Sequence, residues 1–253
     1  MVKEQVICSY DGSFEGFLTT IFTIYEQKLE VVDICPDRQP STDMFSTFFP
    51  VVSNRGHAQR VLKGLQKHAD KRIVKDIYRC FLSELQGVEY RLFLLIQRIF
   101  KENSSHFYDY GDDNIMELHK ILKMMRREVH RMHAFTRFQE LKDGSFAAVI
   151  EPDFNVLPLI GDHFEDRYPA MEWLIFDVKR QYGLYYKDYK TQYVGFQEKL
   201  LEIKVTSLSE EEVEYQDMWK QYFKSVNISE RNNTKLHLRH VPKRYWKNLI
   251  EKQ

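Results

Sequence analysis

The sequence predicts an α+β fold, in which an antiparallel sheet packs with a largely helical N-terminal half and with C-terminal helices. Apolar residues recur at helical spacing from Arg55 to Phe100, whereas the period changes to two after residue 131. The chain has 253 residues, of which 43% are hydrophobic, so it can bury one large core or two small ones. We expect an N-terminal segment at 1–84 and an α+β domain at 85–253, packed together as one compact unit.

A β-α-β unit is predicted at the N-terminus. The apolar run Gln5–Tyr10 ends at an Asp-Gly turn and predicts a strand. A helix is expected from Ser13 to Lys28, followed by a second short strand at 31–34. A polar, proline-containing surface connection at 35–49 then leads into the helical part of the chain.

Four helices are predicted between residues 55 and 131. Gly87 separates the second helix from the third because glycine interrupts the helical pattern. A polar loop at 103–113 precedes the fourth helix, which is expected to span Asn114–Arg131.

A β-β-α-β-β block follows. Apolar and polar residues alternate over 132–139, and a Lys-Asp-Gly turn leads to a returning strand at 145–150, so a hairpin is predicted. A helix at 158–168 has proline in its first turn. Two more strands are expected at 173–178 and 183–189, and this order predicts an antiparallel sheet with helices to one side.

Two helices are predicted at the C-terminus. Ser209 and Glu212 have the spacing of a capping box and begin a helix that runs to about Val226. Pro242 begins a last amphipathic helix, in which Tyr245 and Trp246 are expected to pack on the body of the protein.

The net charge is zero, but the charges are separated along the chain. Residues 55–79 hold eight Lys and Arg, residues 119–137 hold six, and residues 231–253 hold seven, whereas acidic residues gather at 210–217. A neutral protein with such blocks can present a positive face to a polyanion. The alternative is that each block is only the solvated side of a helix.

Cysteine use and hydropathy predict a cytoplasmic protein that does not enter the membrane. The three cysteines are widely spaced and form no CxxC pair, which is typical of a reducing compartment. No apolar run follows a basic start at the N-terminus, and no stretch approaches the ~18 apolar residues of a membrane helix.

A nucleic-acid-binding face is predicted around the first hairpin strand. On a strand, His133, Phe135, Arg137 and Gln139 would share one face, where guanidinium groups bind phosphate and rings stack on bases. The alternative is a half-buried strand whose Arg137 pairs with an acid such as Asp166 or Asp177. The residues predicted to bind nucleic acid are His130, Arg131, Arg137, Arg167, Lys243 and Arg244.

Histidine and aspartate could carry acid–base chemistry. On a helix, His163 and Asp166 share a face, where a carboxylate can orient an imidazole and raise its basicity. His133, His163 and Asp166 are therefore the candidate catalytic residues, with Asp177 as another orienting group. The alternative is a surface ion-pair cluster. No metal or cofactor is predicted, because the HxxH spacing at 130–133 lacks the other residues of a zinc motif and no phosphate-binding glycine loop is present.

Six segments carry a resemblance to a known family. The chain resembles a bacterial family assigned to DNA metabolism or DNA repair, a domain of unknown function. The segments are YDGSFEGFLTTIF at 10–22, FLSE at 81–84, VHRMHAFTRFQ at 129–139, PDFNVLPLIGDHFEDRY at 152–168, WLIFDVKRQYGLYY at 173–186 and HVPKRYWKNLIE at 240–251.

The resemblance implies work on DNA together with an enzyme partner. Similar proteins are encoded beside a radical-SAM protein assigned to DNA modification or repair, and a related domain is fused to uracil-DNA-glycosylase-like domains. The chain has no CxxxCxxC motif, so the radical-SAM cluster would belong to the partner. We therefore expect a protein that binds single-stranded or damaged DNA. The alternatives are a glycosylase- or hydrolase-like enzyme and a scaffold that contacts only its protein partner.

Overall fold

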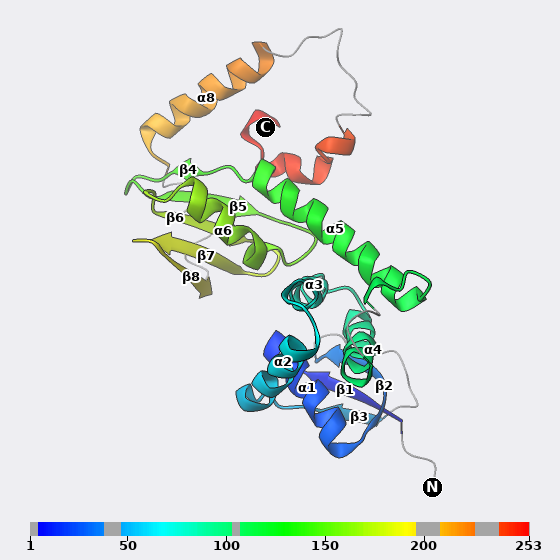
Figure 1. Cartoon of the computed structure of the whole chain (residues 1–253). Coiled ribbons are helices and arrows are strands. Elements are labelled where there is room, and N and C mark those ends of the chain that lie inside the picture. The colour runs from blue at the N-terminus through cyan, green and yellow to red at the C-terminus, as the bar shows by residue number, and fades with distance from the viewer. Residues whose placement is uncertain (1–4, 38–46, 103–106, 196–207, 226–237, 253) are drawn as a thin grey trace. The chain divides into compact units, whose positions relative to one another are not determined.

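The structure is a computed structural model that describes residues 5–37, 47–102, 107–195, 208–225 and 238–252 (Figure 1). The chain divides into two compact units, Met1–Arg126 and Arg127–Gln253, and this boundary falls within the long helix α5 (Asp113–Phe135). The division of the chain after residue 84 stays a prediction.

The first unit contains a three-stranded parallel sheet. Its order is β2-β1-β3, with β1 at Gln5–Tyr10, β2 at Glu30–Pro36 and β3 at Thr47–Pro50. Helix α1 (Phe14–Gln27) connects β1 to β2, so the predicted β-α-β unit is confirmed. Strand β3 was not predicted, because it is only four residues long and ends at a proline.

Three further helices complete this unit, in agreement with the helical periodicity. They are α2 (Arg55–His68), α3 (Lys71–Phe81) and α4 (Val88–Lys101). Asn54 and Asp70 cap α2 and α3 by accepting hydrogen bonds from the backbone N–H groups three residues on, at 3.1 and 2.8 Å. Gly87 has a φ of 76° at the start of α4, which confirms the predicted break.

The second unit contains a five-stranded mixed sheet in the order β4-β5-β6-β7-β8. The strands are β4 (Gln139–Glu140), β5 (Phe146–Ile150), β6 (Trp173–Asp177), β7 (Tyr182–Lys187) and β8 (Lys190–Gly195). The expectation of a wholly antiparallel sheet was wrong, because β5 and β6 pair in parallel. Helix α6 (Leu157–Arg167) makes the crossover between them, and a helical crossover returns the chain in the same direction.

The strand expected at 132–139 was also wrong, because α5 continues to Phe135 and only Gln139–Glu140 pair with β5. The buried face of this helix carries Met125, Glu128 and Met132, and Thr136, directly after the helix, continues their spacing. Two of these four residues are polar, so the helical period was hidden in the hydropathy pattern. His133 and Phe135 therefore lie on a helix and form no row on a strand.

The two C-terminal elements were predicted, one of them with the wrong type of helix. Helix α8 (Glu210–Ser225) begins as expected, with the Ser209 hydroxyl accepting a hydrogen bond from the Glu212 N–H at 3.1 Å. The last element consists of two 3-10 helices, η4 (Lys243–Asn248) and η5 (Ile250–Lys252), instead of one α-helix. Tyr245 and Ile250 are buried, as the amphipathic pattern required.

Aromatic rings and close packing hold α6 on the sheet of the second unit. Trp173 is fully buried and stacks on Tyr186, with ring centroids 5.0 Å apart. A Cβ atom on Gly161 would come within 2.8 Å of a Leu184 methyl group, so the glycine lets α6 pack closely on β7 without a shift of the Leu184 side chain.

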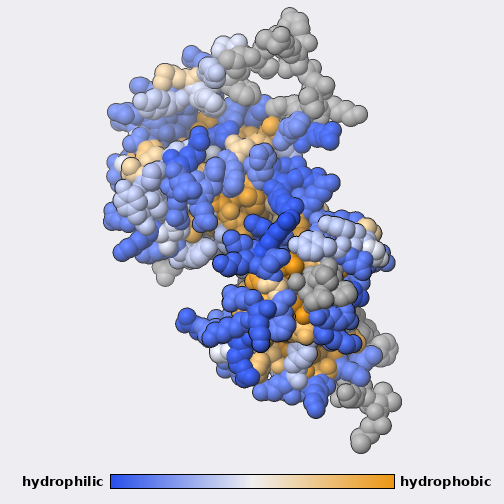
Figure 2. Space-filling model, in the orientation of Figure 1, coloured by the Kyte–Doolittle hydropathy of each residue, from blue (hydrophilic) through white to orange (hydrophobic). Residues whose placement is uncertain are grey.

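Hydrophilic side chains cover most of the surface of both units seen in Figure 2. None of the helices in the described ranges combines the length and the apolar character that a membrane span requires.

Candidate functional site

The last turns of α5 present different residues to two neighbouring segments. Glu128, Arg131 and Phe135 follow each other at helical spacing and contact the C-terminal segment around Tyr245. His133 lies on another face of α5 and contacts His163 of α6. Residues far apart in the sequence therefore meet along one helix.

Glu128 is a buried carboxylate with partners from three segments. Its exposed fraction is 1%, and both of its oxygens lie 2.7 Å from the Tyr245 hydroxyl. The backbone N–H of Asp153, in the loop after β5, donates to it at 3.0 Å. Arg244 and Arg131 approach the same carboxylate at 3.0 and 3.6 Å. The buried charge is therefore both paired and hydrogen-bonded, as burial of a charge requires.

Arg244 lies at the solvent edge of this cluster. It pairs with Asp153 at 2.8 Å as well as with Glu128, and its guanidinium carbon lies 4.6 Å from the centroid of the Tyr245 ring. Burial raises the pKa of Tyr245, and the neighbouring Glu128 raises it further, so the phenol stays protonated and donates its hydrogen bond. Arg244, predicted to bind nucleic acid, is thus engaged inside the protein.

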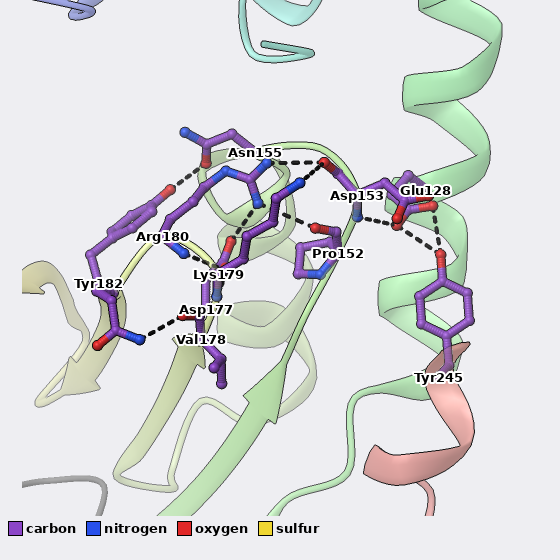
Figure 3. A network of polar contacts seen from close by, with 11 residues as sticks. Glu128, Pro152, Asp153, Asn155, Asp177, Val178, Lys179, Arg180, Tyr182 and Tyr245 are labelled. Atoms are coloured by element: carbon purple, nitrogen blue, oxygen red, sulfur yellow. Dashed lines mark hydrogen bonds and ion pairs between the residues drawn. The ribbon is translucent and has the colours of Figure 1, made fainter. Parts of the chain in front are cut away.

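A second network fixes the loop that contains Asp153 (Figure 3). Asp177, fully buried at the end of β6, accepts from the backbone N–H groups of Lys179 and Arg180 and pairs with Arg180 at 2.9 Å. Arg180 and Lys179 in turn donate to the carbonyl of Asp153, each at 3.1 Å. Burial raises the pKa of Asp177, whereas Arg180 opposes the shift. Asp177 therefore holds the turn that supports this loop.

Arg137 pairs with Glu251 instead of the acids considered from the sequence. The two side chains are 2.9 Å apart, and the indole N–H of Trp219 donates to the other oxygen of Glu251 at 3.1 Å. Burial acts to raise the pKa of Glu251, but hydrogen bonds from its own backbone and from Arg137 outweigh it, and the pKa is lowered. This ion pair ties α8 and η5 to the end of α5.

His133 and His163, two of the candidate catalytic residues, are brought into contact. Their rings stack with centroids 4.0 Å apart and an interplanar angle of 16°. Nε2 of His133 is buried and has no hydrogen-bond partner in the described structure. Burial lowers the pKa of His133, and the nearby His163 and His130 lower it further. His133 is therefore held in the neutral form, with one ring nitrogen unused.

Four of the remaining predicted residues lie on the surface of the second unit. His130, Asp166, Arg167 and Lys243 are exposed. Arg167 donates to the Tyr168 hydroxyl at 3.2 Å. Within the described ranges Asp166 makes no hydrogen bond or ion pair, so the predicted contact with His163 is not formed in this state. No group of three or more possible metal ligands occurs among the described residues.

Sequence reasoning missed the acids that organise this region: Glu128, Asp153 and Glu251. One signal was present, since Glu128 is the single acid in the basic block 119–137. A lone acid among many bases on one helix is a candidate for internal pairing.

The first unit carries a separate basic face on α2 and α3. Seven of the eight lysines and arginines at 55–79 are exposed: Arg55, Arg60, Lys63, Lys67, Lys71, Arg72 and Lys75. Asp76, one of the two acids there, is 1% exposed and is neutralised by Arg79 at 2.8 Å. Aromatic groups adjoin this face, because Phe22 stacks on His57 at 4.0 Å and lies 4.9 Å from the Arg60 guanidinium carbon.

Comparison with known proteins gives one match. The family described as a domain of unknown function, DUF4130, matches residues 86–251, well over half of the chain. No curated protein and no solved structure matches the chain.

Removing the Glu128 carboxylate should destabilise the second unit strongly. We expect Glu128→Ala to lower the free energy of unfolding by roughly 3–5 kcal/mol, because it leaves the buried Tyr245 O–H and the Asp153 N–H without their acceptor and Arg244 without its buried counter-charge. Tyr245→Phe should cost about 1–3 kcal/mol. Urea denaturation of both single variants and the double variant would measure their coupling; additive effects would contradict the direct contact.

Stability should fall on acidification because of His133. Its pKa is below the ordinary 6.5 in the folded protein, so the unfolded chain binds the proton more readily. The free energy of unfolding should decrease as the pH falls below about 6.5 and level off below the folded pKa. Denaturation at about pH 7.5 and about pH 5.5 should show a smaller difference in His133→Gln than in the unsubstituted protein. The exposed His240→Gln is the control, and an equal change in both variants would refute the assignment.

Proposed function

We propose that this chain, which belongs to the DUF4130 family, is a DNA-binding protein of a bacterial DNA repair or modification system and acts with a radical-SAM partner enzyme. The basic face on α2 and α3 is the observation that carries the DNA-binding part. The resemblance of the sequence to proteins encoded beside a radical-SAM protein supports the partner.

The spacing on this face suits a phosphate backbone. Arg60, Lys63 and Lys67 follow each other at intervals of three and four residues on α2, which places them on one side of the helix. Lys71 and Lys75 repeat this spacing on α3. The one exposed acid between them, Asp70, caps α3 by accepting from the Ile73 N–H, and the exposed cations around it can neutralise phosphates and release bound counterions. Such contacts bind DNA without reading its sequence.

The second unit contributes exposed residues beside the paired histidines. Arg131, Arg137 and Arg244 neutralise internal carboxylates, so they are less able to bind phosphate than the sequence suggested. His130, Arg167 and Lys243 remain exposed, and a nucleotide could contact them next to His133 and His163. In this proposal the basic face supplies the affinity for DNA. The histidine pair contacts a base of the bound DNA and presents it to the partner enzyme.

Charge removal on the basic face should weaken DNA binding and its salt dependence. We expect the triple variant Lys63→Gln, Lys67→Gln, Lys71→Gln to make the slope of log affinity against log salt shallower by about 2–3. Fluorescence anisotropy with a labelled single-stranded oligonucleotide would measure it. The control triple variant changes three exposed lysines elsewhere, Lys101, Lys142 and Lys190. Absence of binding at low salt, or equal slopes for both variants, would remove the proposal.

A second candidate function, a nucleic-acid-processing enzyme, is favoured by the unused Nε2 of His133. A neutral imidazole with a free nitrogen can accept a proton, and the stacked His163 disfavours a second positive charge beside it. In this alternative His133 and His163 are the acid and base, and Asp166 would orient His163 only after a change of side-chain position.

Turnover would distinguish the two functions. If the enzyme reading holds, His133→Ala and His163→Ala should abolish cleavage of a uracil-containing oligonucleotide while leaving its affinity within about twofold. The exposed Gln192→Ala in strand β8 should leave both unchanged. Gel electrophoresis after alkali treatment would detect the product. Equal loss of affinity and turnover would indicate damage to the fold.

A further inference from the structure

Helix α8 presents an exposed aromatic face. Tyr215, Met218, Trp219 and Tyr222 have exposed fractions of 58, 55, 41 and 57%. These four residues line a shallow groove of about 350 Å³, and the rings of Trp219 and Tyr222 stack with centroids 5.7 Å apart. Contiguous apolar surface of this kind on a polar protein usually marks an interaction site.

One edge of the aromatic face, at Glu212 and Trp219, anchors α8 to the unit. Glu212 is buried and accepts a hydrogen bond from the backbone N–H of Glu140 at 3.1 Å. The Ser209 N–H donates to the Glu140 carbonyl at 3.1 Å, and Trp219 donates to Glu251. These contacts use Glu212 and Trp219 and leave more than half of the surface of Tyr215, Met218 and Tyr222 exposed.

The charge around the groove is negative. Glu210, Glu211 and Glu214 are exposed in the first turns of α8. Glu211 precedes Tyr215 by four residues and Glu214 precedes Met218 by four, so both carboxylates lie on the aromatic face. The faces of tyrosine and tryptophan rings are also electronegative and attract cations. The carboxylates repel a polyanion. A cationic partner is attracted both by the carboxylates and by the faces of the aromatic rings.

We propose that the aromatic face of α8 docks a cationic amphipathic helix of a partner protein. Apolar side chains of that helix would fill the groove between Tyr215, Met218 and Tyr222, and its lysines or arginines would pair with Glu211 and Glu214. An amphipathic helix binds to such a groove through apolar side chains that lie three or four residues apart in its sequence. The inference does not depend on the proposed binding of DNA, because the two surfaces have opposite charge and lie on different elements.

Two synthetic helical peptides test the docking surface. They share the same leucines at i, i+3, i+4 and i+7, and one carries lysine and arginine where the other carries glutamate. With the full-length chain, the cationic peptide should bind and the acidic peptide should bind at least about tenfold more weakly. Anisotropy of a dye on the peptide reports binding.

Matched substitutions on α8 locate the site. Tyr222→Ala and the double variant Glu211→Gln, Glu214→Gln should each weaken the cationic peptide by about tenfold. Val213→Ala and Asp217→Asn, on the other side of the same helix, should leave its affinity unchanged. Circular dichroism checks that α8 is retained in each variant.

Three results would overturn the proposal. The first is equal or undetectable binding of the two peptides, and the second is an equal effect of Val213→Ala and Tyr222→Ala. The third is a different occupant of the groove. Sedimentation velocity that shows self-association lost in Tyr222→Ala would assign the face to a second copy of the chain. Loss of oligonucleotide binding in Tyr222→Ala would assign it to nucleic acid.

Discussion

The second unit depends on one constraint, the burial of a carboxylate at position 128. A charged group with an exposed fraction of 1% is tolerated only where donors surround it. The donors come from the loop after β5, from η4 and from α5 itself, so the fold must bring these three segments together. Because Asp177 and Arg180 fix the same loop from the other side, the position of the C-terminal segment follows from the sheet (Figure 3).

This constraint also decides which basic residues are available to a ligand. Arginines that neutralise Glu128 and Glu251 are committed to the fold, and moving them to a phosphate would uncover a buried charge. The histidine pair is different, because neither ring is tied to a carboxylate and Nε2 of His133 has no partner in the described structure. The buried Nε2 of His133 is therefore a polar atom that the fold leaves unsatisfied, in contrast to the arginines.

The sequence was sufficient for the elements whose periodicity is carried by apolar residues, such as α2, α3, α4 and the β1-α1-β2 unit. It failed where polar residues are buried. Glu128 takes the place of an apolar side chain on the buried face of α5, and buried Thr136 does the same directly after the helix, so the predicted helix ended too early. Sheet direction depends on the crossover through α6, which strand patterns do not encode. The contact of His133 with His163 was anticipated only as a shared role, since it depends on the packing of α6 beside α5, which the sequence pattern does not show.

The neutral net charge hides two surfaces of opposite character. The cations of α2 and α3 and the carboxylates of α8 lie on different elements. Of the two acids at 55–79, Asp76 is buried and neutralised by Arg79, whereas Asp70 is exposed and caps α3. If the proposed functions hold, opposite charge directs a polyanion to the basic face and a cationic protein segment to α8, because each surface repels the ligand of the other.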